Sequence, residues 1–265
     1  MRMVGLLPRR PGVIAVLMVS TVATPMTGWA QTVPPTAPAD GGWTTEVTAY
    51  GWLSAVKGEI GLRDLPQVDI DNSALDALED VEAAFMATIA AQRGDWLFIG
   101  DASWSRTSDD FAVGRQVGVI TFTHEQLIGS AVVGRRLPVA PPEIQMFATV
   151  GLRYQRFQGE VGVDPESGSI QFRAEGTQDW IDPTVGFVVR HDFDRRWYYS
   201  VIADVGGFGA ASDLTAQIVT QVGYRFNRST SLTFGYRNVF TNYGHDDILY
   251  HVAQGGLVTG LSRRF

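Results

Sequence analysis

Cysteine is absent from the 265 residues of this chain, and lysine occurs once, at Lys57. Without cysteine no disulfide can form, so hydrogen bonds and packing must supply the stability of the fold. Long hydrophobic runs are missing as well. After residue 30 no segment holds the roughly eighteen consecutive apolar residues that a membrane-spanning helix needs, which excludes transmembrane helices from that part of the chain.

Basic residues are outnumbered by acidic ones. The chain has 21 Lys and Arg against 28 Asp and Glu, a formal net charge of −7. Arg2, Arg9 and Arg10 precede residue 31, and without these three 18 basic residues face 28 acidic ones, a charge of −10. A nucleic-acid partner requires a basic face, so this composition argues against one.

Residues 1–30 have the composition of a cleaved signal peptide. The three arginines give a positive start, and the apolar core at 13–19 is too short to span a bilayer as a helix. Gly28 and Ala30 place small residues where a signal peptidase reads them, which predicts cleavage after Ala30; an uncleaved anchor is the alternative. Residues 31–42 begin with a Pro/Ala-rich stretch that has no periodic pattern, so we predict a flexible leader.

Apolar and polar residues alternate through much of the remaining chain. In the segment 214–226, LTAQIVTQVGYRF, one face is largely apolar and the other carries Thr215, Gln217, Gln221 and Arg225. The pattern resumes at 230–241. A strand with lipid on one side and a hydrated or salt-bridged lumen on the other needs this alternation. Soluble strands can show it too, so one strand decides nothing.

Ten segments carry strand patterns, which predicts an all-β fold: an antiparallel transmembrane β-barrel over residues 43–265, with eight or twelve strands as alternatives. Tight connectors alternate with longer polar ones, as in barrels that have short turns on one rim and loops on the other. The predicted strands are 43–55, 81–93, 95–106, 115–136, 145–157, 179–192, 195–205, 213–226, 230–241 and 251–265.

Aromatic residues gather near the ends of these predicted strands. Aromatic rings favour the head-group layer of a membrane, so their positions predict the two girdles of a barrel. The core of a soluble β-sandwich is the alternative. The residues concerned are Trp43, Trp52, Trp96, Trp104, Trp180, Trp197, Tyr198, Tyr199, Phe226, Tyr243 and Phe265.

The last strand ends on Phe265, and counting back by twos gives Arg263, Leu261, Thr259 and Leu257. This tail resembles the assembly signal of Gram-negative outer-membrane proteins, which typically end in Phe on an alternating strand. Arg263 departs from that pattern, since an apolar or aromatic residue is usual there, although an arginine can snorkel to the interface.

Three longer runs resemble small Gram-negative outer-membrane β-barrel proteins, a group mostly without assigned activity. They are TAYGWLSAVKGEIGL (48–62), RGDWLFIGDASW (93–104) and DVGGFGAASDLTAQIVTQVGYRFNRSTSLTFGYR (204–237). The resemblance implies a location in the outer membrane, with its lipid, its lipopolysaccharide and the barrel assembly machinery as partners. Its motifs are architectural, so it implies no cofactor and no catalytic residue.

Seven charged residues fall on predicted inward positions. A ten-stranded barrel is narrow, and unpaired charges in its lumen are costly, whereas mixed signs allow pairing. The set therefore predicts a structural salt-bridge core in a structural or surface-interacting protein. A narrow porin-like channel lined by the same groups is the alternative. The residues are Glu46, Glu82, Asp101, Arg153, Asp204, Arg225 and Arg237.

Catalysis is a further hypothesis, because outer-membrane proteases and lipases are also small barrels. His245 stands beside Asp246 and Asp247 in a predicted outer loop, and a second acidic pair, Asp109-Asp110, could help activate water. Both clusters are also ordinary for polar loops, so we predict no catalytic residue. The acidic stretch 64–80 lacks the Gly and terminal Glu of a calcium loop, and no metal site is predicted. A soluble lipocalin-like barrel is the non-membrane alternative.

Overall fold

A computed structural model describes residues 42–62, 68–75, 80–112, 119–164, 172–245 and 248–265, and shows one antiparallel sheet of eleven strands. The predicted signal peptide at 1–30 and the predicted leader at 31–42 lie almost wholly outside the described residues. The strands are β1 (Thr44–Leu62), β2 (Val68–Asn72), β3 (Val81–Arg93), β4 (Trp96–Ala112), β5 (Val119–Leu137), β6 (Ile144–Asp164), β7 (Phe172–Asp192), β8 (Trp197–Gly207), β9 (Leu214–Arg225), β10 (Thr230–His245) and β11 (Ile248–Arg264).

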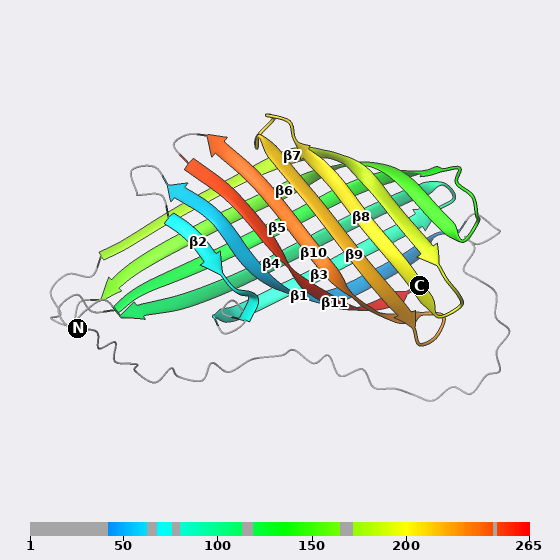
Figure 1. Cartoon of the computed structure of the whole chain (residues 1–265), viewed down its shortest axis with the longest axis horizontal. Helices are drawn as coiled ribbons and strands as arrows, with labels where there is room; N and C mark the ends of the chain where they lie inside the picture. Colours follow the sequence, from blue (N-terminus) through cyan, green and yellow to red (C-terminus); the bar gives the residue numbers. More distant parts are fainter. Residues whose placement is uncertain (1–41, 63–67, 76–79, 113–118, 165–171, 246–247) are drawn as a thin grey trace.

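Ten of these strands close into a barrel, because β11 pairs with β1 over the register Glu46↔Arg264 to Leu62↔Ile248. The prediction of a ten-stranded antiparallel barrel is confirmed. The eleventh strand, β2, was not predicted. It pairs with the part of β1 that extends beyond its contact with β3, and it lies in a connector expected to be a loop. Figure 1 shows the strands running obliquely across the barrel wall.

Several strands are longer than the alternation predicted. β6 continues to Asp164 and β7 starts at Phe172, although 158–178 was expected to be a loop. β6 and β7 stay paired up to Val163↔Phe172, beyond the residues that alternate between apolar and polar. Once both faces of a strand contact water, neither face needs apolar residues, so the period-two signal fades while the backbone hydrogen bonds persist.

The two ends of the barrel differ. At one end, here called the turn rim, four short connectors lie at 94–95, 138–143, 193–196 and 226–229. Gly94 adopts φ +55° in the tightest of them, a left-handed conformation that glycine accepts freely. The first and last described strands meet at this rim, where Phe265 and Thr45 exchange backbone hydrogen bonds of 3.3 and 2.8 Å. At the opposite end, the loop rim, β10 ends at His245 and β11 begins at Ile248.

The outer surface of the barrel is apolar. Val150, Leu152, Ile181, Phe234 and Leu261 each expose more than half of their surface, and all point outward from their strands. A water-soluble protein would not leave so continuous an apolar belt uncovered, whereas lipid covers it at no cost. Among the described residues, no helix is long and apolar enough to cross a membrane.

The girdle prediction holds for one set of aromatics and fails for another. Exposed rings do surround the turn rim, contributed by Trp43, Trp96, Trp197, Phe226 and Phe265. The prediction was wrong for four others, which occupy inward positions of the alternation and are buried in the lumen instead. These four are Trp52, Trp180, Tyr198 and Tyr243.

Candidate functional site

The lumen gathers the charged residues that the alternation turns inward. Arg237 of β10 reaches Asp101 of β4 with an Nη2 to Oδ1 distance of 3.1 Å. Tyr50 of β1 lies between them: its hydroxyl accepts a 2.5 Å hydrogen bond from Arg237 Nη1 and donates one of 2.9 Å to Asp101 Oδ2. Thr88 donates to the same carboxylate oxygen at 2.7 Å. Two strands separated by three others are thus joined across the interior.

A second ion pair lies on the facing wall. Arg153 of β6 is 1% exposed and its Nη2 lies 2.6 Å from Oδ1 of Asp204 on β8. Its Nη1 donates a 3.0 Å hydrogen bond to Thr215 of β9, and Gln217 donates to the other oxygen of Asp204 at 3.4 Å. Buried charges with this many partners avoid most of the desolvation penalty. Together with Arg237 and Asp101, this pair forms what we call the ion-pair layer.

Above the ion-pair layer, toward the loop rim, aromatic side chains fill the lumen. Trp180 stacks on Tyr243 with ring centroids 4.5 Å apart, and Tyr250 meets the edge of Trp180 at 5.5 Å. Phe157 completes this aromatic layer, whose four members are at most 6% exposed. Gln126 donates a 3.0 Å hydrogen bond to the hydroxyl of Tyr250, so the polar end of that ring is satisfied.

The loop between β8 and β9 folds into the lumen and is held there by Asp182. This carboxylate is fully buried and accepts hydrogen bonds from the backbone N–H and the hydroxyl of Ser212, at 2.8 and 2.7 Å. Trp180 Nε1 donates to it at 3.1 Å. Sequence reasoning missed Asp182, although it stands on the inward face of a predicted strand with Trp180 and Thr184. Ser212 had no such signal, because a loop has no periodicity.

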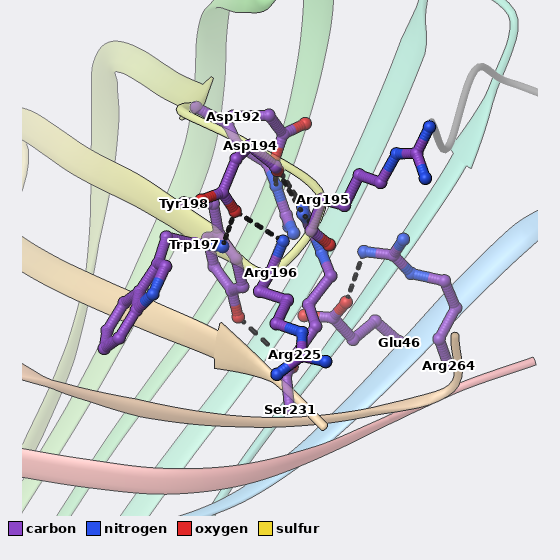
Figure 2. A network of polar contacts seen from close by, with 11 residues as sticks. Glu46, Asp192, Asp194, Arg195, Arg196, Trp197, Tyr198, Arg225, Ser231 and Arg264 are labelled. Atoms are coloured by element: carbon purple, nitrogen blue, oxygen red, sulfur yellow. Dashed lines mark hydrogen bonds and ion pairs between the residues drawn. The ribbon is translucent and has the colours of Figure 1, made fainter. Parts of the chain in front are cut away.

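A polar network lines part of the turn rim (Figure 2). Arg225 pairs with Asp192, and two guanidinium groups contact the ring of Tyr198, with Arg190 3.9 Å and Arg225 4.7 Å from its centroid. The Tyr198 hydroxyl lies 3.2 Å from Oγ of Ser231. This packing uses the absence of a side chain at Gly223, where a Cβ would come within 2.0 Å of the tyrosine ring.

Asp194 organises the turn between β7 and β8. Its Oδ1 accepts hydrogen bonds from the backbone N–H groups of Trp197 and Arg196, at 2.7 and 2.6 Å, as Figure 2 shows. These bonds favour the ionised carboxylate and lower the pKa of Asp194, with the charges of Arg225 and Arg196 adding to the effect. The turn is therefore stabilised at neutral pH by a group that loses its role in acid.

We expect this turn to loosen in acid. Because the folded-state pKa of Asp194 is depressed, its stabilisation is complete above the ordinary aspartate pKa of ~3.9 and is lost as the pH falls through the lower folded value. An NMR titration should show the amide resonances of Arg196 and Trp197 shifting together below that pH. Asp194→Asn keeps an acceptor but cannot titrate, so a persisting transition in that variant would assign it to another group.

The predicted inward charges fall into separate groups in the structure. Asp101, Arg153, Asp204 and Arg237 make up the ion-pair layer. Arg225 belongs to the turn-rim network, and Glu46 pairs with Arg264 there at 2.8 Å. Arg190 and Asp192 were not among the predicted set, although both lie near the end of a predicted strand.

Glu82 does not join these groups. The register of β3 against β4 shifts between Val81 and Ala83, so the alternation is broken at this residue. Its carboxylate lies 2.9 Å from Nε of Arg106, and both side chains are about half exposed (49% and 46%). The period-two count that assigned Glu82 to the lumen could not include this bulge.

The hydrolase hypothesis rests on side chains that the structure does not describe. Asp246 and Asp247 lie outside the described residues, and the side chains of His245, Asp109 and Asp110 do too. Part of the acidic stretch 64–80 is likewise outside them. Within the described ranges, no group of three metal-ligating side chains comes together.

A cavity of about 220 Å³ lies between the ion-pair layer and the turn-rim network. Two inward rows of cross-strand neighbours form one of its walls. The row nearer the turn rim is polar and consists of Gln145, Arg190, Ser200 and Gln221. The row next to it is apolar and consists of Phe147, Val188, Ile202 and Val219.

No protein-family model matches the sequence, and no curated protein is significantly similar to it. Among solved structures, the outer membrane protease OmpT from Escherichia coli matches with a TM-score of 0.52 at 10% identity, over 87% of this chain and 99% of that one. Ail, the attachment invasion locus protein of Yersinia pestis, matches with a TM-score of 0.35 at 10% identity, over 84% and 98%. The toluene transporter TodX of Pseudomonas putida gives 0.27 at 10% identity, over 86% and 90%.

At these identities the likeness concerns the fold and says nothing of protease activity, attachment or transport. Of the three matches, that to OmpT is close enough to carry the fold argument. The chain has the fold of a Gram-negative outer-membrane β-barrel, and its apolar outer belt is the surface that such a barrel turns to lipid.

Proposed function

We propose that the protein is a non-enzymatic barrel of the outer membrane with a closed lumen, acting as a structural or surface-interaction protein. The observation that supports this most directly is the pair of stacked layers that cross the lumen. Arg153 and Arg237 in the ion-pair layer are 1% and 3% exposed, and the aromatic layer above them is equally buried. A water-filled pore would leave such groups hydrated.

Loop-rim residues then carry the contacts with other molecules. We propose that the turn rim faces the periplasm, as both described chain ends lie there. Lipid and lipopolysaccharide would contact the outer belt, and the assembly machinery would engage β11, which ends at Phe265. The cleaved signal peptide at 1–30 remains part of this proposal, since export must precede assembly.

Planar-bilayer recording on the refolded protein tests the closed lumen. We expect no discrete conductance steps, because the proposal has the two layers close the lumen. The narrow-channel alternative predicts steps whose size changes in Arg153→Ala or Arg237→Ala. Steps in the wild-type protein that respond to these substitutions would replace our proposal with the channel. Heat-dependent migration on a gel verifies that each preparation is folded.

A further inference from the structure

The cavity at the turn-rim end of the lumen has the chemistry of a binding site for a small amphiphilic anion. Its volume of about 220 Å³ equals roughly seven water molecules at ~30 Å³ each. Water alone is a poor match for its wall, because Val188, Ile202 and Val219 present a continuous aliphatic strip to the interior. Lumen walls that only contact water are polar.

A positive group borders this strip. Arg190 follows Val188 by two residues on the same face of β7, and its neighbour across the ladder is Ser200. Asp192 is the carboxylate that both Arg190 and Arg225 approach, with Arg190 Nε 3.6 Å from it. Two guanidinium groups therefore share one carboxylate, which leaves positive charge beside the cavity.

Arg190 is also held in place for a ligand. Its guanidinium lies 3.9 Å from the centre of the Tyr198 ring, and Tyr198 itself is 2% exposed. The Nη2 atom of Arg190 is buried and makes no hydrogen bond within the described part of the chain, and the same is true of the hydroxyl of Ser130. Both residues line the cavity. A buried donor without a partner is costly, so a bound acceptor would relieve that cost.

We propose that this cavity binds a small monocarboxylate with a short aliphatic chain, entering from the turn rim. The carboxylate contacts Arg190 and its polar row, and the chain packs on the Phe147–Val188–Ile202–Val219 row. Carboxylate and guanidinium form charge-assisted hydrogen bonds, which are stronger at a partly buried arginine such as Arg190 than in open water. The cavity size limits the chain to a few carbons, and the ion-pair layer blocks passage beyond it.

Hexanoate is the probe for this site, with acetate and hexylamine as its matched comparisons. Binding is measured by isothermal titration on the full barrel in nanodiscs, with empty nanodiscs subtracted. We expect hexanoate to bind at least tenfold more tightly than acetate, which lacks the chain, or hexylamine, which has the opposite charge. This first test uses the wild-type protein alone. Equal affinities for hexanoate and hexylamine, or no binding above the empty nanodiscs, would overturn the proposal.

Two variants locate the site. Arg190→Gln removes the charge and should weaken hexanoate binding about tenfold, whereas Arg196→Gln, at an exposed turn position outside the cavity, should leave it unchanged. Unchanged affinity in a folded Arg190→Gln barrel would place the ligand elsewhere. The inference goes beyond the proposed closed-lumen function, and separate experiments test the two. Conductance through the barrel would refute the closed lumen, whereas the absence of hexanoate binding would refute the binding site.

Discussion

Replacing Arg153 by methionine should lower the free energy of unfolding by about 3–5 kcal/mol, because the carboxylate of Asp204 then stays buried without its cation. Gln217 remains as a neighbour at 3.4 Å but carries no charge. Urea unfolding of the barrel in lipid vesicles, followed by tryptophan fluorescence and gel migration, measures the loss. Among the substitutions considered, this one has the largest expected effect.

Two controls separate a buried-charge effect from a general one. Arg106→Met removes a cation whose partner, Glu82, is half exposed, so the expected cost is under about 1 kcal/mol. The double variant Arg153→Met, Asp204→Leu removes both charges and should recover most of the stability lost by the single substitution. If Arg153→Met and Arg106→Met cost the same, the ion-pair layer is not a stabilising element of the lumen.

Asp182→Ala should release the loop between β8 and β9. The substitution leaves the N–H and hydroxyl of Ser212 and the Nε1 of Trp180 without their shared acceptor, which costs about 2–4 kcal/mol. We expect faster hydrogen exchange at Ser212 and new protease cleavage within 207–213, while the barrel itself stays folded. Hydrogen–deuterium exchange read by mass spectrometry detects the first change, and limited proteolysis detects the second.

Asp179→Ala is the matched control, since Asp179 lies on the same strand but is exposed. In Asp179→Ala, the loop between β8 and β9 should show the same hydrogen exchange and the same protease resistance as in the wild type. Asp182→Asn keeps one acceptor oxygen and should give an intermediate result. A loop that stays protected in Asp182→Ala would show that packing of Ala211 against the aromatic layer, rather than the buried carboxylate, holds it in the lumen.

The alternation of apolar and polar residues predicted most of the fold but missed some of its strands. Closure into ten strands followed from counting period-two segments, because each segment must bury one face against lipid and the ring leaves no unpaired edge. β2 and the extended ends of β6 and β7 escaped the count, since they lie in segments that the sequence predicted as connectors. The girdle prediction, which relied on positions near strand ends, was wrong for Trp52 and Trp180, although their inward parity was readable from neighbouring residues.

For the site, the sequence by itself determined the inward position of six of the seven predicted charges, all but Glu82 at its bulge, because side-chain direction in a strand depends on local parity alone. The same parity holds for Asp182, which the prediction left out. Only the tertiary structure decided which of those charges meet. Arg237 finds Asp101 and Arg153 finds Asp204 because barrel diameter and strand inclination set the distances across the lumen. These quantities depend on every strand at once, so no single segment encodes them.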